Sequence, residues 1–160
     1  MNVSGSPSLA ARVMPALVSA ALVAAIIFVQ QIIGFLFGNL PWQIAGGSSQ
    51  AAASGLQALG ASLITYTLPF AVGVFASLWL LAPVRAGMRL WPLVGRGLLA
   101  SLAGAVAVLI VNVLTGLGSH GLIDFFSSLL AQIFGCVSTA VNEAPIVILV
   151  LVVQHLVRRR

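Results

Sequence analysis

Four long apolar stretches without Asp, Lys or Arg dominate the sequence, and they run over about 13–37, 61–82, 97–117 and 137–157. Each is close to the roughly 20 residues that a helix needs to cross the hydrocarbon core of a bilayer. Only the last contains an acidic residue, Glu143. Because lipid offers no hydrogen bonds to an exposed backbone, such stretches must be helical. The sequence therefore predicts an all-α membrane protein, a single domain over 1–160 built as an antiparallel four-helix transmembrane bundle.

The composition excludes a water-soluble chain. Hydrophobic residues make up 61% of the sequence, charged residues 6%, and the mean hydropathy is +1.17. Soluble domains carry roughly 25% charged residues, since their surfaces must bind water. Soluble globular, disordered and coiled-coil chains are therefore excluded, and we expect the lipid bilayer to be the chain's main surrounding.

The arginines predict the orientation of the bundle. They lie at the ends of the apolar stretches, not in a solvated patch with interleaved aromatic residues, so the net charge of +5 does not indicate nucleic-acid binding. Arg12 precedes the first stretch, 85–96 carries three arginines between the second and third, and 158–160 ends the chain. The positive-inside rule puts all of these on one side, so both termini are expected to be cytoplasmic. The Ala, Gly, Val and Arg bias favours a bacterial chain and hence the inner membrane.

The segment before the fourth stretch has a helical pattern of its own. Apolar residues recur over 122–134 at helical spacing, which predicts a short amphipathic helix lying in the membrane interface. A single helix over 122–157 would be about 54 Å long, against a hydrocarbon core of roughly 30 Å. We therefore expect a break or kink at Gly135 or Pro145. A re-entrant helix, or one continuous with the fourth span, are the alternatives.

Polar side chains inside the four spans fall in one layer, about 8–10 Å below the outer surface at 1.5 Å per residue. A bundle would bring them together and let them hydrogen-bond. This layer is the candidate site for protons or a small solute, and bundle stabilisation is the alternative. Its members are Gln30, Gln31, Thr65, Tyr66, Thr67, Asn112, Asn142 and Glu143.

Glu143 is the member of this layer with the most specific chemistry. A charged carboxyl near the middle of a membrane costs about 2.5–3.5 kcal/mol on insertion scales, so its neutral, proton-carrying form is favoured. A proton-coupled carrier needs such a group, and Pro145 would free a nearby carbonyl for a ligand. Two structural roles remain as alternatives. A protonated Glu143 would lock the bundle by bonding a neighbouring amide, or a shifted helix would place it at the interface.

Small residues at helical spacing predict close helix contacts, and in lipid such contacts also favour homo-oligomers. They are Gly34 and Gly38 in the first span, Gly73 in the second, and Gly97 with Ser101 in the third. His155 comes at the end of the fourth span, where the helix dipole favours a cation, and we expect it at the membrane interface.

The sequence holds no complete catalytic or metal-binding set. It lacks HExxH and GxSxG motifs and has no second carboxylate within a span. The lone Cys136 excludes an intramolecular disulfide, and His120 with Asp124 lacks a third metal ligand. We expect no enzyme, no cofactor and no metal. The predicted function is a non-catalytic accessory or structural membrane subunit with a membrane-protein partner or a second copy. A small proton or solute transporter using the layer around Glu143 is the alternative.

Overall fold

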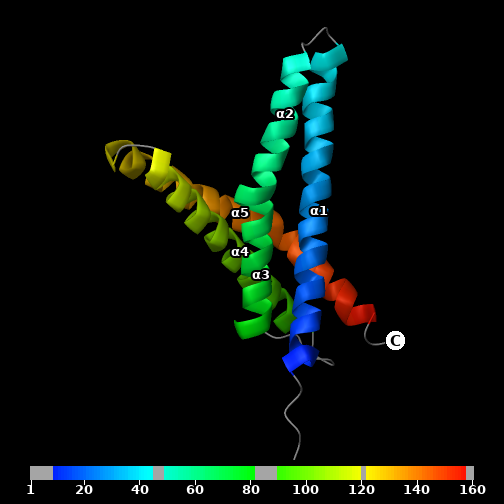
Figure 1. Cartoon of the computed structure of the whole chain (residues 1–160). Coiled ribbons are helices and arrows are strands. Elements are labelled where there is room, and N and C mark those ends of the chain that lie inside the picture. Colours follow the sequence, from blue (N-terminus) through cyan, green and yellow to red (C-terminus); the bar gives the residue numbers. More distant parts are fainter. Residues whose placement is uncertain (1–8, 45–48, 82–89, 120–121, 158–160) are drawn as a thin grey trace, which may run out of the picture.

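The computed structural model describes residues 9–44, 49–81, 90–119 and 122–157, and all of them are helical (Figure 1). Its side chains are described over 13–38, 53–80, 90–116 and 129–157. The elements in chain order are α1 (Leu9–Ile44), α2 (Ser49–Ser62), η1 (Leu63–Thr67), α3 (Leu68–Ala76), η2 (Ser77–Leu81), α4 (Leu90–Ser119) and α5 (Leu122–Val157).

Four of the described helices are long and apolar enough to span a membrane. The elements α2, η1, α3 and η2 follow one another without a gap and form one long helix, called here the second helix. The four apolar segments are Val13–Gly38, Ala53–Leu80, Leu90–Gly116 and Leu129–Val157. This confirms the predicted all-α membrane fold, because each predicted apolar stretch lies on a separate long helix.

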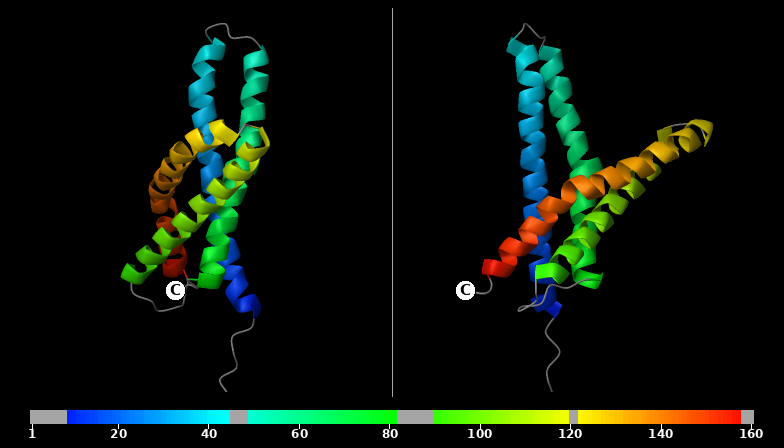
Figure 2. Two further views of the ribbon diagram at one scale, coloured as in Figure 1. Left: turned by 90° about the vertical axis from the view of Figure 1, so that its left-hand side faces the viewer. Right: turned by 180° about the vertical axis from the view of Figure 1, so that it is seen from behind.

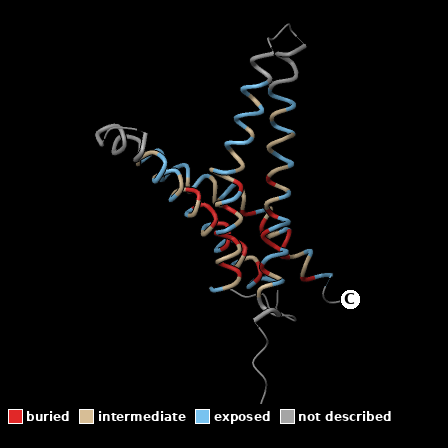
Figure 3. The backbone as a smooth tube through the Cα atoms, viewed as in Figure 1, coloured by how far each residue is buried: buried red, intermediate tan, exposed pale blue. Residues whose placement is uncertain are grey.

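The four helices form two pairs that meet at one end only. In Figures 1 and 2, α1 lies beside the second helix and α4 lies beside α5, and the pairs lean apart away from the chain ends. Every buried residue falls within 16–27, 67–78, 93–108 or 144–155, and Figure 3 shows these together in the half near the chain ends. We call this the closed half. The remaining described parts of the four helices form the open half.

The closed half is a ring of four helices. The second helix contacts α1 and α4, and α5 also contacts α4 and α1. Within the described residues, no Cα atom of α5 comes within 8 Å of the second helix, and α1 and α4 are separated in the same way. The second helix and α5 therefore lie diagonally across the interior of the ring.

A close contact between the second helix and α4 holds the two pairs together. A side chain at Gly73 would meet the backbone of Ala103 and Gly104, and one at Gly104 would meet the ring of Phe70. Phe70 is fully buried. The small residues thus let the two backbones approach until Phe70 fills the remaining space, in the dense packing of protein interiors.

The other predicted small residues differ in their surroundings. Gly97 of α4 packs against Ile148 of α5, so the predicted close approach occurs there. Gly34 and Gly38 have no neighbouring atom within 4 Å of an added Cβ. Their GxxxG pattern therefore brings no other described helix close to that face of α1.

The segment 122–157 differs from the preferred prediction. It forms one helix, α5, and not an amphipathic helix followed by a separate span. The helix does not end at Gly135 or at Pro145. Gly135 weakens a helix by only about 1 kcal/mol, and Pro145 removes one backbone hydrogen bond. One turn before Pro145, the Ser101 hydroxyl of α4 donates to the Ala140 carbonyl at 2.5 Å and ties the helix to its neighbour.

The second helix widens just before Pro69. Proline has no N–H to donate and its ring crowds the preceding turn. In η1 the Leu68 N–H bonds the Leu63 carbonyl, five residues back, in place of the usual four. Such π segments are frequent at functional sites. Here the segment carries three of the predicted polar-layer residues, Thr65, Tyr66 and Thr67.

We predict that Gly73→Ala lowers the stability of the bundle by about 1–3 kcal/mol, the usual cost of overpacking. The added methyl group would overlap the Ala103 backbone, which cannot move aside as a flexible side chain can. Reversible denaturant unfolding in detergent micelles, followed by circular dichroism, measures the effect. Gly34→Ala is the matched control, because its methyl meets open space. Equal stability of the two variants would contradict the packing described above.

Candidate functional site

A hydrogen bond between Tyr66 and Glu143 joins the two helical pairs where they begin to separate. The Tyr66 hydroxyl donates to Glu143 Oε1 at 2.8 Å, from η1 of the second helix to α5. The Tyr66 ring stacks on Phe70 with ring centroids 6.2 Å apart and planes 15° apart. Phe70 is held in the tight contact with α4. Its aromatic ring therefore fixes the direction in which the Tyr66 side chain points towards α5.

The second carboxyl oxygen of Glu143 takes no part in the bond to Tyr66. Glu143 Oε2 is buried and has no hydrogen-bond partner within the described chain. An unpaired buried carboxylate oxygen is costly, and a proton or a bound water relieves the cost. This oxygen can therefore accept a further hydrogen bond.

Two other members of the predicted layer are satisfied locally. Ser62 donates to the Gln31 side chain at 2.8 Å, linking α1 to the end of α2. The Thr65 hydroxyl donates to the Ala61 carbonyl of its own helix at 2.9 Å. The first bond ties α1 to α2, and the second lies within the second helix.

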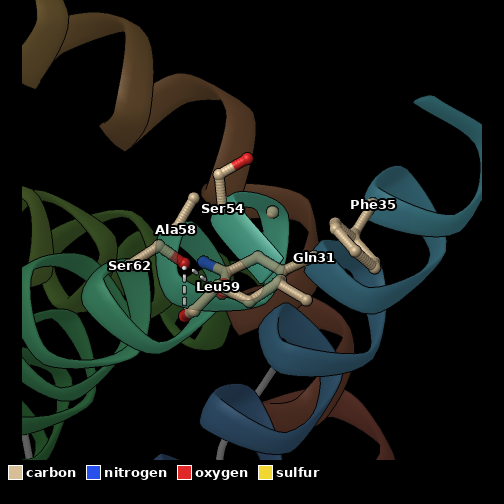
Figure 4. Close-up of a pocket in the computed structure, with 7 residues that line it drawn as sticks. Gln31, Phe35, Ser54, Ala58, Leu59 and Ser62 are labelled. Atoms are coloured by element: carbon tan, nitrogen blue, oxygen red, sulfur yellow. Dashed lines mark hydrogen bonds between the residues drawn. The ribbon is translucent and has the colours of Figure 1, made fainter. Parts of the chain in front are cut away.

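A groove lies beside the Gln31–Ser62 bond, between α1 and α2 (Figure 4). Its lining residues are Gln31, Phe35, Ser54, Gly55, Ala58, Leu59 and Ser62. The Phe35 ring fits against Gly55, where any side chain would collide with it. The groove lies in the open half, neither Tyr66 nor Glu143 lines it, and its hydrogen-bonded pair links α1 to α2.

Three amide residues of the layer stay on the surface of the chain. Gln30 of α1, Asn112 of α4 and Asn142 of α5 are exposed. The Asn142 amide reaches only Ser138 of its own helix, at 3.4 Å. The prediction that the bundle brings the whole layer together is therefore wrong. The helical pairs lean apart at this level, and among the described side chains of the layer only Tyr66 and Glu143 form a hydrogen bond between the pairs.

The closed half contains polar groups that sequence reasoning did not bring together. The Ser19 hydroxyl lies 2.7 Å from the side-chain oxygen of Gln154, joining α1 to α5. His155 is only 3% exposed, so it lies inside the bundle and not on its surface. A sequence signal for this burial exists, because His155 follows the buried Val147 and Leu151 at four-residue spacing.

The described residues contain no group of three His, Cys, Asp or Glu side chains able to hold a metal ion. Cys136 is a half-buried free thiol. His120 and the side chain of Asp124, considered above as an incomplete metal site, lie outside the part that the structure describes.

Comparison of the chain with protein-family models, with curated proteins and with solved structures gave no match.

We predict that Tyr66 and Glu143 are energetically coupled. In a double-mutant cycle of Tyr66→Phe and Glu143→Leu, the free energy of unfolding should show a coupling of about 1 kcal/mol, because each substitution removes the same hydrogen bond. Unfolding in detergent micelles gives the four free energies.

The control cycle pairs Thr65→Val with Glu143→Leu. Thr65 lies next to Tyr66, but its hydroxyl bonds Ala61 and shares no partner with Glu143. This cycle should be additive within about 0.5 kcal/mol. Additive behaviour in the Tyr66 cycle as well would mean that the contact is absent in solution.

Proposed function

We propose that this chain is a non-catalytic subunit of a membrane complex and binds further transmembrane helices through its open half. The observation that carries the proposal is the exposure of Gln30, Asn112 and Asn142 within membrane-spanning segments. We assign no catalytic role, since the sequence has one Glu, one Asp and none of the catalytic motifs tested above.

Exposed amides are informative because hydrocarbon cannot satisfy them. A lipid-facing asparagine or glutamine loses its bonds to water and gains none. Between transmembrane helices, each such bond contributes about 0.6–2 kcal/mol. The exposed leucines and valines of the same helices do not indicate a partner, because apolar side chains lose no hydrogen bonds in lipid.

The orientation in the membrane rests on the sequence alone. We propose a multi-pass chain in a bacterial inner membrane with both termini in the cytoplasm, on the basis of the arginine distribution. The closed half, which carries the described helix ends nearest the termini, then faces the cytoplasm.

A second candidate function is proton-coupled transport through Glu143. What supports it is the buried, unpartnered Glu143 Oε2 beside the Tyr66 hydrogen bond. Ionisable groups inside membrane proteins commonly mark proton or ion pathways. The two functions are compatible, because a subunit of a transport complex can carry its proton site.

We predict that native mass spectrometry of the protein, gently extracted from its own host membrane, detects a second, different chain in fixed stoichiometry. Replacing all three amides by leucine (Gln30→Leu, Asn112→Leu and Asn142→Leu) should weaken this complex by about tenfold or more, since several hydrogen bonds are lost together.

The control is Val141→Leu together with Leu114→Ile, because both residues are exposed apolar neighbours of the amides. The control should keep the complex intact. A lone monomer or a homo-oligomer in the native spectrum would contradict the subunit proposal and favour the second candidate.

A further inference from the structure

The buried face of α1 continues past the point where the two helical pairs part. Its buried apolar residues follow one another at spacings of three and four, which places them on one face of the helix. They are Ala16, Ala20, Val23 and Ile27. The next position in this series is Gln30, which is exposed. Gln30 therefore lies on the face of α1 that points into the bundle in the closed half.

The contacts of neighbouring positions agree with this direction. On one side of the face, Ser19 contacts Gln154 of α5. On the other side, Gln31 accepts a hydrogen bond from Ser62 of the second helix. With 3.6 residues per turn, Gln30 lies between these two directions. It therefore starts from the side of α1 that is turned towards the interior of the ring of helices.

The buried face of α4 continues in the same way. Ser101, Ala105 and Val108 are buried and follow one another at spacings of four and three. The next position in this series, four residues further on, is Asn112, which is exposed. The inward faces of α1 and α4 thus each carry an amide directly beyond their last buried residue.

The two amides also lie at matching heights above the junction of the pairs. Gln31 is level with Ser62 through their hydrogen bond, and Gly73 is level with Gly104 through the close contact. Ser62 precedes Gly73 by about 17 Å of helix, and Asn112 follows Gly104 by about 12 Å, at 1.5 Å per residue. The difference of about 5 Å is less than one helical turn.

Asn142 does not share this placement. The buried residues of α5 are Ala144, Val147, Val150, Leu151 and His155. Asn142 is seven residues before Leu149, which is 59% exposed, so the two share the opposite, outward face of the helix. Only two of the three exposed amides therefore continue a buried face.

The open half leaves room for the two pairs to approach each other. Within the described residues, no Cα atom of α2 lies within 8 Å of α4 or α5, and Figure 2 shows the same separation. In the closed half, the contact of Gly73 with Gly104 joins the pairs. Helices that are packed at one end and separate at the other can close by a hinge motion about the packed end.

We propose that the open half closes by such a motion, until Gln30 and Asn112 hydrogen-bond to each other across the interior. Each amide has both a donor and an acceptor, so the pair satisfies groups that hydrocarbon leaves unpaired. The closed state withdraws these two amides from a partner helix and leaves Asn142 on the surface. As a regulation of partner binding, this inference rests on the proposed function.

The distance between two spin labels in the open half tests the proposal. The labels are attached at Leu36→Cys of α1 and Ala131→Cys of α5, which are exposed and belong to opposite pairs. Cys136→Ala removes the only native thiol. In the purified full chain in lipid nanodiscs, pulsed electron paramagnetic resonance should show two distances, because one interhelical hydrogen bond is weak enough for both states to be populated.

Substitution of the amides should change the ratio of the short to the long distance. Gln30→Leu and Asn112→Leu should each lower it about 3–30-fold, the effect of losing one hydrogen bond between transmembrane helices. The double variant should lower it no further, because both substitutions remove the same bond. Asn142→Leu is the matched control, since it removes an exposed amide on the outward face, and it should keep the ratio within about twofold.

A single long distance in the unmodified chain would overturn the closing motion. An equal effect of Asn142→Leu, or additive effects of Gln30→Leu and Asn112→Leu, would also overturn it. The foreign chain detected by native mass spectrometry would still stand in each of these cases. Two distances with the expected response to the variants, but no foreign chain in the native spectrum, would confirm the closing motion and contradict the proposed function.

Discussion

Hydrocarbon forms no hydrogen bonds, and every feature of this chain follows from that constraint. The backbone satisfies itself in four long helices, since nothing around them can do so. The helices then associate through contacts that lipid cannot replace. Gly73 and Gly104 let two backbones meet around Phe70, and Tyr66 reaches Glu143 from the same contact. The packed core and the polar bridge are thus parts of one junction.

The sequence was sufficient for the fold class and for part of the site. Charge-free stretches of membrane length identify helices almost independently of tertiary structure. Tyr66 and Glu143 were both placed in the polar layer, because their depth follows from helical rise alone. The sequence did not show that the helical pairs lean apart. How two helices cross depends on the volumes of the side chains at their contact, such as Phe70 against Gly104. Because the pairs lean apart, Gln30, Asn112 and Asn142 remain exposed.

His155 and α5 show a second limit of sequence reasoning. The histidine was placed by its distance from the chain end, but its burial follows from its face on α5, in line with Val147 and Leu151. The helix was expected to break because of its length, but length alone breaks no helix when its axis can tilt. The π segments of the second helix were not foreseen. In η1 the Leu63 carbonyl accepts the Leu68 N–H. The Thr67 hydroxyl, four residues after Leu63, has no hydrogen-bond partner among the described residues.

The hydrogen bond between Tyr66 and Glu143 is the central claim, and infrared spectroscopy tests it directly. Glu143 is the only glutamate in the chain, so isotope-labelled glutamate gives one carboxyl signal in a lipid bilayer. The account predicts that Tyr66→Phe shifts this signal, because the carboxyl loses the donor to Oε1, whereas Thr65→Val leaves it in place. A signal that Tyr66→Phe does not move would show that the two side chains do not meet in the membrane, and would contradict the junction on which the account depends.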